Sequence, residues 1–480
     1  MGEFILYLFL LSIWNVILFS GKSVGLSAVL FMVPMLILIY YFFKKKKLIN
    51  NKKGLLFMIP IMLLSISYLI FDSTLFNGLN YLVIPTLMIL MYIFTIKPTF
   101  KLGEIVDNYI RLIFEPISCI GTFIDDIKNK FKTTKKISDN TKRIIKSLII
   151  ILPIVILVLI LLSNADMIFK GLFDDIVNFF KELDIFNEFF SKTFRFLIIL
   201  FIIGATFIFL DKKYKDLKVV DSSIHIKDST TLKLLIIILD IIYIVFDFIQ
   251  IKSLMLHHVA SNINYASYAR QGFFELMAVS LINIAIILLS KKIDNINEKD
   301  NKIINISSIL MVVLTLIIIV SSFLRMNLYE NAYGYTMLRL LVYISLITEV
   351  ILLEPTIIYI FNPKFNIVKS YMIIIICVYT VINFANLDYL IAKRNITRYY
   401  KTDKIDIYYL ENYHTDNIPL LLDLYNNSKD EKIINELDIY LESIKNNKNL
   451  DWQEYNISKK KAYHKLKDYK NDSILKAIKH

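Results

Sequence analysis

The sequence predicts an all-α, polytopic helical membrane protein with about eleven transmembrane helices and a small helical C-terminal domain. Its 480 residues are 56% hydrophobic and only 20% charged, whereas soluble globular chains carry roughly 25% charged residues. Apolar runs of about 20 residues recur along the chain, and this length crosses a hydrocarbon core of about 30 Å. The runs lack the alternating pattern of a membrane β-barrel, so helices are expected to satisfy the backbone groups in lipid.

The apolar runs divide the chain into four parts. Spans are predicted near residues 4–20, 24–43, 55–71, 79–96, 144–163, 194–210, 232–251, 272–290, 303–323, 336–358 and 370–387. The first four form an N-terminal membrane part (1–98), and a cytoplasmic amphipathic connection follows (99–143). The other spans form a membrane core (144–390), which leads into the helical C-terminal domain (391–480).

Lysine clusters indicate the orientation of the chain. They occur at Lys44–Lys47, between Lys97 and Lys146, at Lys212–Lys218, at Lys291–Lys292 and at Lys364–Lys369. Each cluster follows an even number of predicted spans, and short basic loops stay on the cytoplasmic side of a membrane. We therefore expect a cytoplasmic N-terminus and, because the number of spans is odd, a C-terminal domain outside.

Two segments outside the spans have apolar residues at helical spacing. The connection carries them from Ile105 to Ile120, ahead of a lysine-rich stretch. A helix of this kind lies flat on a membrane, so we expect it to contact anionic lipid of the inner leaflet. The alternative is that it packs on the protein's own cytoplasmic helix ends. The tail shows the same spacing in Ile418–Leu424 and Ile433–Ile444, which predicts helices there.

The composition argues against several classes of function. Cys119 and Cys377 support neither a disulfide framework nor a cysteine metal site. The formal charge is +13, but the basic residues lie between apolar runs rather than on one face, so no nucleic acid is expected as a partner. No phosphate-cradling glycine motif is present. His257 and His258 are adjacent and diverge by about 100° on a helix. We expect no cofactor and no metal, and an enzyme is not favoured.

Polar and charged residues inside or beside the spans are the candidate functional residues. Asp240 and Asp247 are seven residues apart, so they share a helix face, and Gln250 widens it. A charge inside the membrane requires a partner or water. The other candidates are Tyr268, Arg270, Glu275, Arg325, Tyr329, Tyr333, Arg339 and Glu349. They form an internal network that fixes helix packing, line a pathway for a solute, an ion or protons, or bind a lipid headgroup or a partner.

Four stretches combine into a recognisable pattern. They are Leu161–Asp166 with Phe169, Phe248–Gln250 with Tyr265–Leu276, Ser321–Arg339, and tail residues Asn386–Leu410 with Asp451–Ala462. Together they resemble a family of large bacterial polytopic membrane proteins known only as a domain of unknown function, over roughly residues 140–465. The chain departs from that family's pattern at Asn164, where Ser is usual, and at Ser267, where Glu is usual.

The resemblance implies a multi-pass protein of the bacterial cytoplasmic (plasma) membrane with undefined activity. The residues themselves favour transport or permeation of a small solute or ion through a polar intramembrane seam. The alternative is a non-catalytic envelope or signalling component that binds a partner protein or anionic lipid at its outer face. A third hypothesis is a transferase for a lipid-linked substrate, with Arg270 and Arg325 binding phosphate. Membrane lipids are expected partners in each case, and the oligomeric state stays open.

Overall fold

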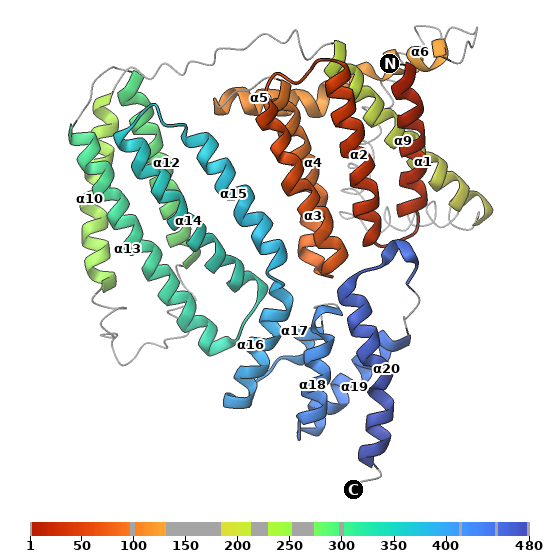
Figure 1. Cartoon of the computed structure of the whole chain (residues 1–480). Coiled ribbons are helices and arrows are strands. Elements are labelled where there is room, and N and C mark those ends of the chain that lie inside the picture. Colours follow the sequence, from red (N-terminus) through yellow and green to blue (C-terminus); the bar gives the residue numbers. More distant parts are fainter. Residues whose placement is uncertain are drawn as a thin grey trace, which may run out of the picture. The chain divides into compact units, whose positions relative to one another are not determined.

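The chain is helical throughout the part that the computed structural model describes, which confirms the predicted all-α class (Figure 1). The described residues are 2–96, 101–130, 184–212, 229–251, 273–296, 302–411, 415–446 and 450–477. They form two compact units that do not follow the order of the chain. Unit 1 comprises residues 1–69, 81–220 and 450–455, and unit 2 comprises residues 70–80, 221–449 and 456–480.

Unit 1 contains the N-terminal helices and the connection that follows them. Its elements are α1 (Gly2–Phe19), α2 (Leu26–Lys45), η1 (Lys52–Phe57), α3 (Met58–Ile70), α4 (Thr74–Ile96), α5 (Leu102–Phe114), η2 (Glu115–Cys119), α6 (Ile120–Lys130), α9 (Asp184–Lys212) and η6 (Trp452–Glu454). The first residues of α4 belong to unit 2. α9 packs along α1, where the Arg195 guanidinium donates to Asn15 Oδ1 at 3.1 Å and to the Phe19 carbonyl at 2.9 Å. A cation at the last turn of α1 also complements the helix dipole.

The short tail segment 450–455 lies against the turn between α1 and α2. The Tyr455 carbonyl accepts from the Leu26 backbone N–H at 2.9 Å, and the Glu454 carboxylate accepts from the Ser23 N–H at 2.6 Å. These contacts satisfy N–H groups at the start of α2 that have no partner inside the helix. Lys22 and Asp451 add an ion pair. Glu454 and Tyr455 of the tail pattern therefore hold the start of a membrane helix.

Unit 2 contains the other long helices and most of the tail. Its elements are α10 (Ser229–Gln250), α12 (Phe273–Ile296), α13 (Lys302–Tyr333), α14 (Met337–Phe361), α15 (Ile367–Phe384), α16 (Leu387–Thr402), α17 (Ile407–Glu411), η5 (Thr415–Asn417), α18 (Ile418–Asn427), α19 (Glu431–Asn446) and α20 (Ile457–Ala477). The tail helices bury an apolar core of their own, which includes Leu421, Leu437 and Leu466. The helices predicted at Ile418–Leu424 and Ile433–Ile444 are thus present as α18 and α19.

Seven helices in the described chain are long and apolar enough to cross a membrane. They are Leu26–Lys45, Lys52–Ile70, Thr74–Ile96, Ser191–Asp211, Lys302–Tyr333, Met337–Phe361 and Ile367–Phe384. The predicted span near 4–20 corresponds to a shorter apolar helix, Phe4–Phe19. The predicted spans near 232–251 and 272–290 correspond to α10 and α12, whose side chains are described only in part. The predicted span 144–163 lies outside the described residues, so the count of eleven is not confirmed.

Candidate functional site

The candidate site lies in the four-helix cluster of unit 2, with α13 at its centre (Figure 1). α10, α12 and α14 all pack against α13, and their apolar contacts include Ile236, Ile287, Met311 and Leu346. At 32 residues α13 is long enough to cross the hydrocarbon core with turns to spare. These neighbours cover part of α13, whereas Ile306, Val313 and Val320 on another side of the helix are exposed.

A stripe of fully buried hydroxyl groups follows one face of α13. Ser308, Thr315 and Ser322 are each 0% exposed and stand seven residues apart. Seven residues make about two helical turns, so these side chains lie above one another. α10 repeats the interval with Asp240 and Asp247, which are 3% and 2% exposed. Both helices thus turn a polar face into the cluster instead of an uninterrupted apolar one.

Hydrogen bonds join these faces across three helices. The Tyr243 hydroxyl of α10 donates to Asn283 Oδ1 of α12 at 2.8 Å. The Asn283 amide in turn donates to Thr315 Oγ1 of α13 at 3.0 Å, and that hydroxyl donates to the Met311 carbonyl at 2.7 Å. Asn283 and Thr315 each both accept and donate a hydrogen bond, whereas Tyr243 begins the chain as a donor and the Met311 carbonyl ends it as an acceptor.

Three carboxyl groups are buried beside the chain of hydrogen bonds. Glu349 of α14 is 2% exposed and accepts a short hydrogen bond from Ser280 of α12, while its other oxygen has no protein partner. Ser307 hydrogen-bonds the Asp240 side chain. Neither oxygen of Asp247 has a hydrogen-bond partner. Within the described ranges, none of the three carboxyls forms an ion pair with Lys or Arg.

We call this set of groups the polar seam. It comprises Asp240, Tyr243, Asp247, Ser280, Asn283, Ser308, Thr315, Ser322 and Glu349. Beyond one end, α12 carries Lys291, which is 1% exposed and donates to Asn305 Oδ1 of α13 at 2.7 Å. Toward the other end, α13 carries Arg325, which is 7% exposed. Basic side chains therefore flank a seam of carboxyl, hydroxyl and amide groups.

The signature block from Arg325 to Arg339 forms the end of the four-helix cluster. Gly334 adopts a left-handed conformation (φ +86°) in the turn between α13 and α14, and Thr336 caps α14. Arg339 donates a short hydrogen bond to the Gly334 carbonyl and stacks on Tyr329, with its guanidinium carbon 4.3 Å from the ring centroid. The Tyr343 hydroxyl donates to the Glu330 carboxylate at 3.1 Å. The residues of this block thus build a helix corner.

The tail helix α16 holds the same corner. Asn395 pairs with Tyr335 through two hydrogen bonds, accepting from its N–H at 2.9 Å and donating to its carbonyl at 2.8 Å. Arg398 donates to the Ala332 carbonyl at 2.8 Å. The Tyr409 hydroxyl accepts from the Met337 N–H at 2.8 Å. A Cβ atom on Gly334 would lie 2.8 Å from Asn395 Oδ1, so the close approach requires glycine.

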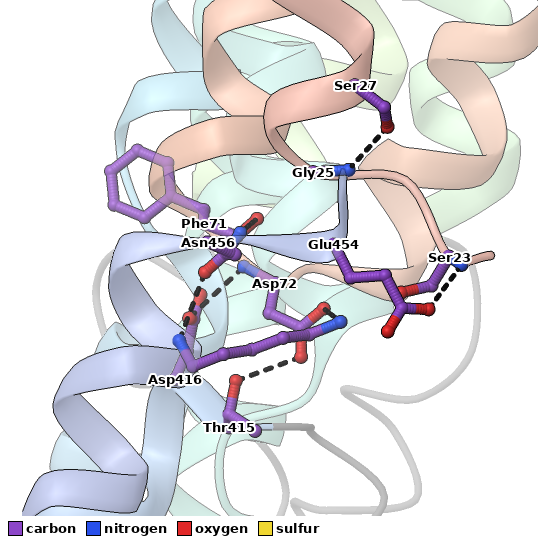
Figure 2. A network of polar contacts seen from close by, with 10 residues as sticks. Ser23, Gly25, Ser27, Phe71, Asp72, Thr415, Asp416, Glu454 and Asn456 are labelled. Carbon is purple, nitrogen blue, oxygen red and sulfur yellow. Dashed lines mark hydrogen bonds and ion pairs between the residues drawn. The ribbon is translucent and has the colours of Figure 1, made fainter. Parts of the chain in front are cut away.

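A second cluster of buried charges joins η5 and α20 to the turn before α4 (Figure 2). Thr415 donates to Asp72 at 2.9 Å, and Asp416 accepts from the Asp72 backbone N–H at 3.2 Å. Lys459 Nζ lies 3.4 Å from the Asp72 carboxylate. Asp388 of α16, 3% exposed, completes the cluster. Burial raises the pKa of Asp388 to about 6; the Ser73 hydroxyl lowers it, and the charges of Asp416 and Asp72 raise it.

This cluster does not have the arrangement of a metal centre. In the part of the chain that the structure describes, no group of three or more His, Cys, Asp or Glu side chains is placed to hold a metal ion. The carboxylates of Asp72 and Asp416 are instead occupied by Thr415, Lys459 and backbone N–H groups. We therefore treat the cluster as a junction of the tail and the polar seam as the candidate functional site.

A cavity of about 790 Å³ between α1 and α2 is a weaker candidate. Its lining is apolar and aromatic, and it contains no charged side chain. The indole N–H of Trp14 lies there but already donates to the Leu30 carbonyl at 3.0 Å. Such a surface offers nothing to orient a polar ligand.

The structure places the predicted site residues in three groups. Asp240, Asp247 and Glu349 lie in the polar seam, whereas Tyr329, Tyr333 and Arg339 lie at the helix corner, where Tyr333 is 55% exposed. Tyr268 and Arg270 lie outside the described residues, as do the side chains of Gln250 and Glu275. Sequence reasoning did not single out Ser280, Ser308 or Thr315, and it used Ser322 only within the family pattern and Lys291 only as part of a cytoplasmic lysine cluster. The seven-residue interval of the three α13 hydroxyls was the available signal.

The described residues are helical and include seven apolar helices of membrane length, which identifies a multi-pass membrane protein. The chain belongs to the family described as "Domain of unknown function (DUF4153)", which matches residues 58–424. The match includes the helix corner and the polar seam and ends before Asp451 of the tail. No curated protein and no solved structure matches the chain. Membership of this family identifies the class of protein but indicates no activity.

Proposed function

We propose that the polar seam conducts protons across the membrane. The observation that carries this proposal is the burial of three carboxyls inside a four-helix cluster without an ion pair to Lys or Arg among the described residues. Placing a charge at the centre of a membrane helix costs about 2.5–3.5 kcal/mol on insertion scales, and such residues mark ion pathways and proton relays. A sequence that served packing alone would gain from replacing these carboxyls by apolar groups.

The chemistry of the seam suits stepwise proton transfer. A carboxyl group can accept a proton on one oxygen and release one from the other. A hydroxyl or an amide can donate one hydrogen bond and accept another at the same time. A change in one bond of the chain through Tyr243, Asn283 and Thr315 can therefore change the next bond, on a neighbouring helix. Ser280, also on α12, hydrogen-bonds Glu349 of α14 and so brings a carboxyl to the same helix as Asn283.

The seam is also long enough for this task. The seam hydroxyls of α13 from Ser308 to Ser322 rise about 21 Å at 1.5 Å per residue, and the buried Arg325 and Glu330 beyond the seam bring the polar side chains of this helix to about 33 Å. The hydrocarbon core is about 30 Å thick. The polar groups of α13 therefore extend across the whole apolar layer rather than marking one depth.

The packing favours protons over larger cargo. Ser280, Asn283, Ser308, Thr315 and Ser322 are each 0% exposed and are surrounded by the apolar core of the cluster. Metal ions need several convergent oxygen ligands, and the described residues contain no group of His, Cys, Asp and Glu placed to supply them. A proton passes along hydrogen bonds without a cavity of its own size.

The tail supports an orientation for this pathway. It hydrogen-bonds the Asp72 turn before α4 and the Gly334 turn between α13 and α14. Both turns follow an odd number of predicted spans, whereas the lysine clusters follow even numbers. We propose that the tail lies outside the cytoplasm, and the seam then runs from the cytoplasmic Lys291 end to the outer Arg325 end.

The alternative, a partner or lipid headgroup bound by the signature arginines, draws less support. The guanidinium of Arg339 is already used by the Gly334 carbonyl and the Tyr329 ring. A transferase for a lipid-linked substrate also lacks a metal-holding group among the described residues. The exposed Tyr333 is the feature of this corner best placed to touch another molecule.

The experiment is proton uptake by proteoliposomes that contain the full chain, driven by a potassium diffusion potential and followed with a pH-sensitive dye. We expect uptake above that of protein-free liposomes and a loss of at least tenfold in Glu349→Gln. Glu354→Gln is the matched control, because this carboxyl lies on the same helix but is exposed. Equal uptake by wild type and Glu349→Gln in equally folded protein would refute the proposal.

A further inference from the structure

Helix α5 has two apolar faces, only one of which is covered by the protein. Ile105, Asn108 and Leu112 are buried on one side. The other side exposes a stripe that consists of Leu102, Val106, Ile110, Ile113 and Phe114, each between 41% and 63% exposed. Their spacing of three to four residues aligns them along the helix. We call them the α5 stripe.

A hydrogen bond fixes the depth of α5 relative to a membrane helix of the same unit. The Tyr109 hydroxyl lies 3.0 Å from Thr86 Oγ1 of α4. Thr86 stands nearly three turns before the end of α4 at Ile96, about 15 Å along its axis. A tyrosine side chain is much shorter than that distance, so α5 lies alongside the last turns of α4 rather than beyond its end. In Figure 1, α5 runs across the direction of α3 and α4.

The charges of α5 are largely used within the helix. Arg111 forms ion pairs with Asp107 at 2.9 Å and with Glu115 at 3.6 Å, and Lys101 pairs with Glu104 at 3.6 Å. These five groups carry three negative charges against two positive ones. The helix therefore offers no net attraction to anionic headgroups, which such helices normally gain from an excess of Lys and Arg on the polar face.

We propose that α5 lies in the plane of the membrane with its stripe inserted among the acyl chains of one leaflet. Its contact with lipid is apolar and independent of headgroup charge. The stripe then lies at the same membrane depth as lipid-facing residues of the neighbouring spans. The ion pairs of α5 lie toward the headgroup layer. The inference concerns unit 1 and does not depend on the proton pathway in unit 2.

The test is quenching of a bimane label by lipids brominated on their acyl chains. In a chain in which Cys119 and Cys377 are replaced, the label is attached at Ile110→Cys or, as a second stripe position, Val106→Cys. Asp107→Cys on the ion-paired side is the control. We expect at least threefold stronger quenching at the stripe positions than at Asp107 in nanodiscs of phosphatidylcholine.

The same quenching is expected when half of the lipid is phosphatidylglycerol. Quenching at Ile110 and Val106 no stronger than at Asp107 would overturn the insertion. Quenching that requires the anionic lipid would overturn the claim that apolar contact suffices. Disulfide formation between Ile110→Cys residues of two chains, together with weak quenching, would instead assign the stripe to a second copy.

Discussion

Replacing Asp388 by Asn should stabilise the junction between the tail and the Asp72 turn at neutral pH. Asp388 is 3% exposed and stands near two other carboxylates, Asp72 and Asp416, with Lys459 as the cation of the cluster. An ionised Asp388 therefore adds a third negative charge to a buried site with one positive charge. Asparagine keeps the shape and removes that charge.

The magnitude follows from the pKa of Asp388, which burial raises from 3.8 to about 6. One pKa unit corresponds to about 1.36 kcal/mol, so protonation of Asp388 favours the folded over the unfolded state by about 3 kcal/mol at most. Because the folded-state pKa is higher than the unfolded-state pKa, the stability that protonation provides is complete below about pH 4. It is lost as the pH rises through about 6. At pH 7.5 the wild type should thus be less stable than at pH 4, and Asp388→Asn should lack this loss.

Hydrogen exchange of the α16 amides, measured from pH 4 to pH 7.5 and corrected for the intrinsic rate, reports local opening of the junction. We expect Asp388→Asn to open about 3 kcal/mol less readily than wild type at pH 7.5 and to match it at pH 4. Asp403→Asn, an exposed position at the end of the same helix, is the control. If the free energy of opening changed with pH equally in wild-type and Asp388→Asn protein, the charge assigned to this cluster would be wrong.

Two further substitutions test the corner and the α1–α9 contact. Gly334→Ala should destabilise the corner by about 1–3 kcal/mol, because alanine is strained at φ +86° and its Cβ meets Asn395 Oδ1 at 2.8 Å. Faster hydrogen exchange at the start of α14 would report this, and unchanged exchange would contradict it. Arg195→Ala should lower the free energy of unfolding by about 1.5–3 kcal/mol, since it removes two charged hydrogen bonds. Thermal unfolding in detergent measures the loss, and Arg195→Lys should recover part of it; an unchanged midpoint for Arg195→Ala speaks against the contact.

Local patterns account for much of the architecture. Hydropathy over about 20 residues marks the membrane helices, and the seven-residue interval of Asp240 and Asp247 indicates a shared face, which is buried in the structure. The same interval on α13 was readable but less visible, because Ser and Thr occur in membrane helices for many reasons. A hydroxyl becomes informative only when a carboxyl or an amide faces it from another helix.

Contacts between distant residues could not be read in this way. Asn395 meets Tyr335 across 60 positions, and Thr415 meets Asp72 across 343. Nothing in the local sequence of Asp388 distinguishes it from a solvent-exposed aspartate at the start of a helix. Its environment arises only when the tail folds against the Asp72 turn. The signature block was recognisable as a pattern, but its physical meaning, a glycine corner held by Asn395, required the fold.

The reversal potential of the current carried by the wild-type chain in a planar bilayer tests the proton pathway most directly. With a pH difference between the two sides and equal salt, the current should reverse at the proton equilibrium potential. Replacing sodium by potassium on one side should not move it. No current above that of a protein-free bilayer, or a reversal potential that follows the metal ion, would contradict the role assigned to the polar seam.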